Sequence, residues 1–187
     1  MILFMPDQLR NTLAILERTP SVLDTWLRGL PEFWTHGNYG PGTWCAFEVV
    51  GHLIKGEQGD WIPRMRIILE HGTARPFDPF PHDAAIHPDS GRSLDDLLDE
   101  FAELRSKNLE VLRATPITDE LLTRRGRHPA LGEVTLGQLL STWAAHDLHH
   151  LAQVGKAMTN QHRERVGPWR DYFNTMVAKG AVGSPLL

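Results

Sequence analysis

Two histidines, His146 and His150, lie one helical turn apart in the segment 143–153. In an α-helix, residues four apart project from one face, about 40° and 6 Å from each other. Two imidazoles placed in this way can bind one divalent cation. The spacing alone is weak evidence, because histidines that are hydrogen-bonded at a core boundary show the same pattern. The pair borders an apolar stripe, which places it at the edge of a hydrophobic core.

A third candidate ligand, His52, flanks the apolar face of an earlier helical segment. Its neighbours on the helix surface are Cys45, Gly56 and Gly59, and such small residues would leave room for a metal or for a ligand beside it. Three neutral imidazoles and one open position suit Zn²⁺, and Ni²⁺ or Fe²⁺ are compatible with the same ligands. The sequence therefore predicts a divalent metal on His52 and the histidine pair.

Acidic residues near these histidines are candidates for proton transfer. The angle of Asp147 places its carboxylate in the middle of an apolar helix face, where a buried charge needs partners. It either accepts hydrogen bonds from a Trp indole or backbone amides, or it orients a ligand histidine and exchanges protons with a nucleophile. Glu48, one turn before His52, and Glu57 have the same two interpretations, and Glu57 has a simple partner in Arg64. Asp147 and Glu48 are the predicted catalytic residues.

Two further groups could do chemistry but are expected to be structural. Cys45 lies two turns from His52, about 10 Å along the helix axis, and a buried thiol is the more frequent case. The arginines of the segment 124–127 are expected to form a solvated connection. A less frequent role for them is to bind the carboxylates of an anionic thiol cofactor or substrate at a pocket mouth.

The elements that position these residues are amphipathic helices separated by Pro- and Gly-rich connections. Pro20 is expected to bend or split the first helix, and Pro63 with its neighbouring glycines to distort the second. The predicted helices cover about 7–30, 44–70, 93–114 and 135–160, with a short fifth helix at about 168–179.

Capping patterns and connections complete this organisation. Thr43, Ser93 and Thr135 are predicted N-caps of the second, third and fourth helices. Residues 75–89 form a proline-rich crossover or lid, and 117–134 an irregular connector, with no convincing strand in either. The pattern predicts an all-α four-helix bundle with long crossover connections, in a single domain over residues 1–187.

Composition limits the class of protein. The chain has 187 residues, of which 41% are hydrophobic, so it can bury a sizeable core. A net charge of −4 with interspersed signs excludes the basic patches typical of nucleic-acid or anionic-membrane binding. The single cysteine excludes an internal disulfide framework, and no export signal or membrane span is evident. We therefore expect a cytoplasmic protein with small-molecule partners.

The chain resembles the DinB-like (YfiT-like) superfamily of metal-dependent enzymes. The resemblance is carried by the segment 44–53 with Glu57 and Trp61, and by the segments 132–136 and 146–153. It implies an up-down-down-up four-helix bundle, often dimeric, whose divalent metal is held by one histidine of the second helix and two of the fourth. These are His52, His146 and His150 here. Cys45 departs from the pattern, because serine or threonine is more usual at that position.

The resemblance also implies candidate activities. Characterised relatives include thiol S-transferases that use bacillithiol or glutathione, and a mycothiol-dependent maleylpyruvate isomerase. On this basis the first candidate is thiol S-transfer, with a low-molecular-weight thiol as co-substrate. A metal-dependent hydrolase is the alternative, with Asp147 or Glu48 moving the proton. A third interpretation is a non-catalytic helical bundle that serves in a stress response or binds a partner. A homodimer is expected from the resemblance alone.

Overall fold

The computed structural model describes residues 5–81, 83–173 and 175–176. Long helices carry most of the chain, and a two-stranded hairpin and short helical turns connect them. The elements in order are α1 (Asp7–Leu16), α2 (Thr19–Leu27), α3 (Glu32–Thr35), α4 (Ala46–Gly59), α5 (Trp61–His71), η1 (Pro88–Ser90), α6 (Leu94–Ala114), α7 (Asp119–Leu122), β1 (Arg125–His128), β2 (Gly132–Thr135), α8 (Leu136–Asn160) and η2 (Gly167–Tyr172).

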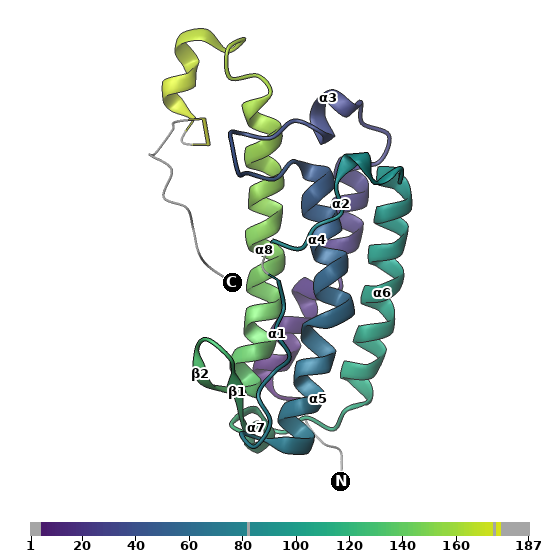
Figure 1. The fold of residues 1–187 in the computed structure, drawn as a ribbon, viewed down its shortest axis with the longest axis vertical. Coiled ribbons are helices and arrows are strands. Elements are labelled where there is room, and N and C mark those ends of the chain that lie inside the picture. The colour runs from purple at the N-terminus through teal and green to yellow at the C-terminus, as the bar shows by residue number, and fades with distance from the viewer. Residues whose placement is uncertain (1–4, 82, 174, 177–187) are drawn as a thin grey trace.

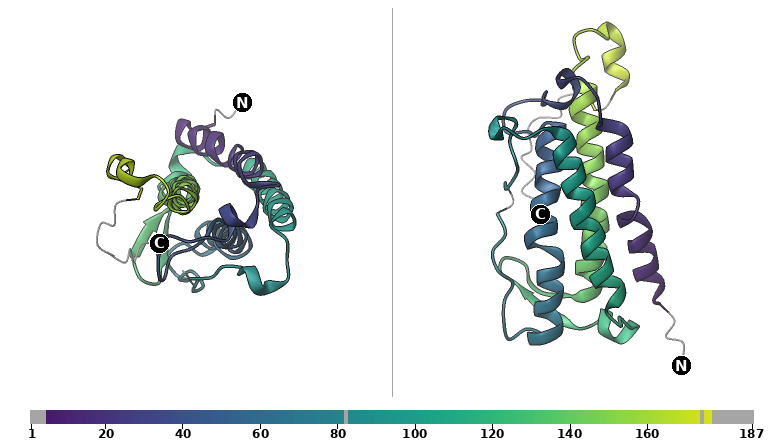
Figure 2. Two further views of the ribbon diagram at one scale, coloured as in Figure 1. Left: turned by 90° about the horizontal axis from the view of Figure 1, so that it is seen from above. Right: turned by 90° about the vertical axis from the view of Figure 1, so that its right-hand side faces the viewer.

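Four helical rods form the bundle, and Figure 1 shows their directions. The rod α1–α2 rises, α4–α5 descends, a long crossover returns to the top, α6 descends and α8 rises. Seen from above in Figure 2, the rods surround a common interior. This arrangement confirms the predicted four-helix bundle and its up-down-down-up order. None of the described helices is long and apolar enough to cross a membrane.

Prolines divide the first two rods, as the sequence predicted. A proline inside a helix lacks an N–H and displaces the carbonyl four residues before it. Pro20 therefore interrupts the first rod after Leu16, where α1 ends. Pro63 interrupts the second rod after Gly59, and Asp60 there has φ −105° and ψ −69°.

Helix starts agree with two of the three predicted caps. The side chains of Ser93 and Thr135 accept hydrogen bonds from backbone N–H groups at the starts of α6 and α8. Thr43 is not a cap, because α4 begins later, with Cys45 at the N-cap. The Cys45 N–H donates to Glu48 at 2.9 Å, so the carboxylate of this first turn determines where the helix starts.

The prediction of an irregular, strand-free connector at 117–134 is wrong. It contains α7 and an antiparallel hairpin in which Arg125 pairs with Thr135 and His128 with Gly132. Gly132 has φ +78°, which the hairpin needs and a side chain would disfavour. Gly126 lies against Ile68, where an added Cβ would approach to 2.5 Å. Close backbone packing therefore holds the hairpin in place. For this reason the strands cannot be predicted from an alternation of apolar and polar residues.

The C-terminal segment also differs from the predicted helix at 168–179. The structure has a 3₁₀ helix there, Gly167–Tyr172, whose first residue is a glycine with φ +56°. Residues 174 and 177–179 of the predicted helix lie outside the described residues. The 3₁₀ form fits a short exposed segment that buries no apolar face, because such segments gain little from continuing as an α-helix.

Two apolar clusters fill the bundle. The lower one joins α1, α5, the end of α6 and the start of α8, around Trp61 and Trp143. The upper one joins α2, α4, the start of α6 and the later part of α8, around Phe47 and Phe101. The buried polar residues of α4, α6 and α8 lie between the two clusters along these helices. The bundle interior therefore contains a polar layer, and buried polar groups require partners.

Arg105 of α6 is the centre of that layer and is 1% exposed. Its guanidinium donates to both oxygens of Asp147, at 2.6 and 2.9 Å, and to Glu57 Oε1 at 2.9 and 3.1 Å. It also donates to the Leu16 carbonyl at 2.9 Å. Trp143 Nε1 donates to Glu57 at 3.0 Å. One cation thus connects α1, α4 and α8 to α6.

We predict that Arg105→Met strongly destabilises the fold, because it leaves two carboxylates buried without their cation. Breaking such an arrangement typically costs about 3–5 kcal/mol of unfolding free energy. The matched control on the same helix is Arg113→Met, which removes an exposed ion pair with Glu17 and should cost about 1 kcal/mol or less. Urea denaturation of both variants measures the difference. Equal losses of unfolding free energy in the two variants would show that the buried cluster contributes no more to stability than the exposed ion pair.

Candidate metal centre

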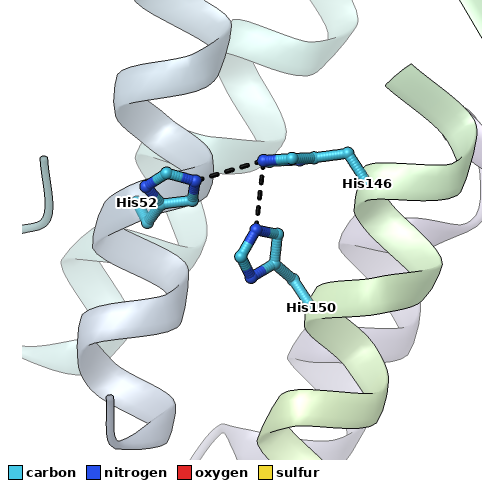
Figure 3. A group of neighbouring side chains, drawn as sticks. All are labelled: His52, His146 and His150. Atoms are coloured by element: carbon cyan, nitrogen blue, oxygen red, sulfur yellow. Dashed lines mark hydrogen bonds between the residues drawn. The ribbon is translucent and has the colours of Figure 1, made fainter. Parts of the chain in front are cut away.

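Three imidazoles meet inside the bundle, one from α4 and two from α8. His52 Nε2 lies 3.1 Å from His146 Nε2, which lies 3.0 Å from His150 Nε2, as Figure 3 shows. The ligand atoms of the three residues all lie within 4.8 Å of one another. All three side chains are buried. The structure therefore brings together the three histidines that the sequence selected.

The spacing of these nitrogens fits a shared cation. Zinc binds imidazole nitrogen at about 2.0–2.1 Å with tetrahedral geometry, so two nitrogens on one zinc are about 3.3 Å apart. The observed separations of 3.0 and 3.1 Å differ from this by a few tenths of an ångström. Small side-chain rotations would cover that difference.

The hydrogen bonds made by Nδ1 of His52 and His150 determine whether Nε2 of each ring carries a proton or a lone pair. His52 Nδ1 donates to the Ala84 carbonyl at 2.8 Å, which fixes the proton on Nδ1 and leaves Nε2 as a lone pair. His150 Nδ1 is likewise paired with Gln153 Oε1, at 2.8 Å. His146 Nε2 can give a proton to only one of its two neighbours. Three converging nitrogens therefore lack enough protons to satisfy one another, and a cation would resolve this.

Burial keeps His146 and His150 neutral, as metal ligands must be. Burial, with the nearby His150 and His52, lowers the pKa of His146 to about 2. Burial, with the nearby His52, lowers the pKa of His150 to about 3. His146 Nδ1 is buried and has no hydrogen-bond partner among the described residues. Its ring is held by packing, with the edge of Trp61 at a centroid distance of 5.1 Å.

Aromatic rings enclose the three imidazoles. The Trp44 ring centroid is 4.6 Å from that of His52 and 6.0 Å from that of His150. The space expected beside Gly56 and Gly59 is filled, because an added Cβ there would meet Trp61 at 3.3 Å and Phe80 at 3.6 Å, respectively. That expectation is wrong for the space itself. Gly56 allows the close approach of Trp61, whereas an added Cβ at Gly59 would make ordinary contact with Phe80.

The long crossover covers His52 with a segment that we call the strap, residues 84–87. Besides the Ala84 carbonyl on His52, Ile86 packs so closely on Gly51 that an added Cβ would lie 2.5 Å from the Ile86 nitrogen. His87 Nδ1 lies 2.7 Å from Glu48 Oε1. The crossover thus folds over the site, but His87 binds Glu48 and is not in the histidine group. His82 lies outside the described residues.

The predicted acidic residues have other partners in the structure. Asp147 binds Arg105 with both oxygens, so the expected bond to a Trp indole or backbone amide is wrong. Glu57 accepts the hydrogen bond of the Trp143 indole. Its expected pairing with Arg64 is also wrong, because Arg64 Nη1 lies 2.6 Å from Asp60 Oδ1. Glu48 caps α4 and binds His87. The catalytic roles of Asp147 and Glu48 stay predictions.

Cys45 is buried, and burial raises its pKa to about 11, so its thiol is protonated at neutral pH. This agrees with the structural role expected for it. Of the arginine group, Arg124 donates to the Ile68 carbonyl at 2.8 Å and Arg125 to Glu133 at 2.6 Å. Neither belongs to the described lining of the cavity beside His146, which Arg64 lines instead.

Sequence reasoning missed three contributors to this region. Arg105 left a signal, because it interrupts the apolar stripe of α6 between Phe101 and Leu109. The sequence shows Arg64 only as one of several charged residues on an amphipathic helix. Ala84 had none, because it acts through its backbone carbonyl, and backbone hydrogen bonds depend on the path of the loop.

Known proteins can now be compared with this site and fold. The family model described as the DinB superfamily matches residues 15–154. A protein of Oceanobacillus iheyensis, named "Putative metal-dependent hydrolase", is 24% identical over 151 residues, covering 80% of this chain and 77% of that protein.

Among solved structures, YfiT from Bacillus subtilis matches with a TM-score of 0.69 and 22% identity, over 89% of this chain and 92% of that one. Its title describes "a probable metal-dependent hydrolase with an unusual four-helix bundle topology". At this identity the match supports the fold alone, which agrees with the rod order in Figure 1. The family model, by contrast, matches most of the chain and includes His52, His146 and His150. The chain belongs to the DinB superfamily.

Proposed function

We propose that this protein is a metal-dependent enzyme whose divalent cation is held by His52, His146 and His150. The observation that carries the proposal is the convergence of three imidazoles, in which His146 Nε2 lies 3.1 and 3.0 Å from the Nε2 atoms of His52 and His150, and two of the rings have Nδ1 paired with an oxygen. The names of the relatives, which refer to metal-dependent hydrolases, support the same class. Zn²⁺ fits the donor set best, and Ni²⁺ or Fe²⁺ also fit.

A divalent cation on three neutral ligands acts as a Lewis acid and lowers the pKa of a water or thiol bound beside it. The protein residues supply positioning. Ala84 and Gln153 orient two imidazoles, and Trp44 and Trp61 exclude bulk water from the rings. Arg105 forms ion pairs with the carboxylates of Glu57 and Asp147, which lie on the same helices as the ligands.

Two reactions remain candidates within this class. Thiol S-transfer is favoured by the site itself, because no carboxylate belongs to the described metal-ligating group and Asp147, Glu57 and Glu48 are all bonded elsewhere. A thiolate attacks without a general base, whereas hydrolysis generally uses one. Hydrolysis is favoured by the names of the relatives. We infer S-transfer as the first candidate and hydrolysis as the second.

Metal content tests the proposal directly. Purified protein should contain about one divalent cation per chain, and His146→Ala should reduce this to trace level, because two imidazoles bind far more weakly than three. His149→Ala is the matched control, since His149 is the exposed neighbour on the same helix. Elemental analysis of the three proteins gives the answer. Trace metal in the wild type after reconstitution with Zn²⁺ would refute the proposal.

The strap provides a second, more sensitive test. Gly51→Ala places a methyl group against the Ile86 backbone, so the strap must shift and the Ala84 carbonyl should leave His52. Losing such an outer hydrogen bond typically weakens metal binding by about 10–100-fold. Gly59→Ala, whose Cβ makes ordinary contact at 3.6 Å, should change affinity much less. Competition with a chromogenic chelator measures both, and unchanged affinity in Gly51→Ala would remove the positioning role of the strap.

The two reactions are separated by an assay with a model alkylating electrophile and a model ester, each with and without added low-molecular-weight thiols. S-transfer predicts loss of the electrophile that depends on the thiol and on the bound metal, with no ester cleavage. His146→Ala should abolish it, and His149→Ala should retain it. Ester cleavage that is independent of thiol would instead identify a hydrolase.

A further inference from the structure

A cavity of about 80 Å³ lies directly beside the metal centre. Its walls come from α5, the start of α8, the hairpin β1–β2 and the crossover before the strap. His146 is part of its lining, and so is Phe80, whose ring centroid is 6.1 Å from that of His52. A molecule in this cavity would therefore lie next to His146.

Most of the wall is apolar. It is formed by aromatic and aliphatic side chains from four separate segments: Trp61, Phe77, Phe80, Leu131, Val134 and Leu139. Ligand sites typically combine such walls with a few polar groups that fix orientation. The volume is about half of the roughly 150 Å³ of an apolar cavity known to hold benzene, so it suits a short chain or part of a small ring.

Arg64 is the cationic side chain among the residues that line this cavity. Its side chain is only 9% exposed, and Nη1 binds Asp60 Oδ1 at 2.6 Å. Nε is buried and has no hydrogen-bond partner among the described residues, and the guanidinium lies 5.3 Å from the Phe77 ring centroid. Burial lowers the pKa of Arg64, and Asp60 opposes this.

A buried guanidinium has five N–H donors and gains from every acceptor that it meets. Within the described part of the chain, the Nη1–Oδ1 contact is the ion pair of Arg64, and it leaves most of that capacity to other acceptors, in an environment where unmade hydrogen bonds are expensive. Arg64 thus differs from Arg105, whose Nε, Nη1 and Nη2 all have protein acceptors. The difference indicates that Arg64 is available to a ligand.

We propose that this cavity is the substrate subsite of the enzyme, and that it takes a small apolar molecule whose carboxylate or carbonyl oxygen is bound by Arg64. The apolar body contacts Trp61, Phe77 and Phe80, next to the histidines. Calling the bound molecule a substrate rests on the proposed function. Its binding to Arg64, by contrast, needs no metal.

The test uses benzoate as the probe and toluene as its counterpart without an oxygen acceptor, in ligand-observed NMR titrations. Benzoate should bind at least tenfold more tightly than toluene to the wild-type protein. Arg64→Met should weaken benzoate at least tenfold and leave toluene within about twofold. Arg66→Met, the exposed arginine two positions along α5, should change neither.

A second variant keeps the result interpretable if Arg64→Met unfolds. Thr142→Phe adds a ring from α8 into the same cavity, so it should exclude both probes and leave Arg64 and Asp60 intact. Circular dichroism melting of each variant shows whether it is folded. Unchanged benzoate binding in a folded Arg64→Met or in a folded Thr142→Phe would overturn the proposal.

Comparison of metal-loaded and metal-free protein separates this inference from the proposed function. Benzoate bound through Arg64 should bind both forms, with affinities within about threefold. If benzoate binds the loaded form alone and ignores Arg64→Met, its carboxylate ligates the metal, and the subsite assignment is overturned while the metal proposal stands. If the protein never holds a metal but benzoate depends on Arg64, the proposed function fails and the pocket remains a binding site.

Discussion

The ion cluster around Arg105 is the constraint on which the arrangement of this bundle depends. Its two carboxylates, Glu57 and Asp147, belong to the helices that carry the histidines, and Asp147 directly follows His146. Because both are bound by one rigid guanidinium, the distance between α4 and α8 is fixed at that level. Apolar packing alone tolerates small sliding of helices, whereas a multidentate ion cluster has a narrow optimum. The nitrogens of His52 and His146 meet one turn away from this fixed point.

The same cluster explains why the break in the first rod matters. Pro20 prevents the Leu16 carbonyl from being used within the helix, and that carbonyl accepts a hydrogen bond from Arg105 at 2.9 Å. The proline that interrupts the first rod thus leaves a backbone carbonyl that Arg105 binds in the bundle interior. The polar layer then separates two apolar clusters, and each cluster holds one end of the rods. The stability of the Arg105 cluster comes from the pairing of all three guanidinium nitrogens, since a partly paired cluster of this kind would destabilise the fold.

Sequence reasoning identified the bundle and the histidine trio because each has a local or repeated signal, whereas the order of the rods was implied by the resemblance to the DinB-like superfamily. Helical periodicity runs through all four rods, and His146 and His150 have a spacing that geometry alone interprets. What it missed depends on contacts between distant segments. The hairpin is held by close backbone packing at Gly126, and the partners of Glu57 and Asp147 lie on α6. The Ala84 carbonyl is invisible to any side-chain pattern. Arg105 was visible as a charge in an apolar stripe, but a stripe cannot show which carboxylate such a charge meets.

The three histidines are not held equivalently, and this asymmetry relates the candidate metal centre to the cavity. His52 and His150 each have Nδ1 paired with an oxygen, so their rings are fixed by directional bonds. His146 has no such bond among the described residues and is held by Trp61 and its neighbouring imidazoles. It is also the histidine that lines the cavity, where Trp61 contacts both the ring and the space beside it. A molecule that enters the cavity would therefore press on the least restrained ligand. The side of the centre that faces Arg64 is the side on which the geometry can adapt, as a reacting substrate would require.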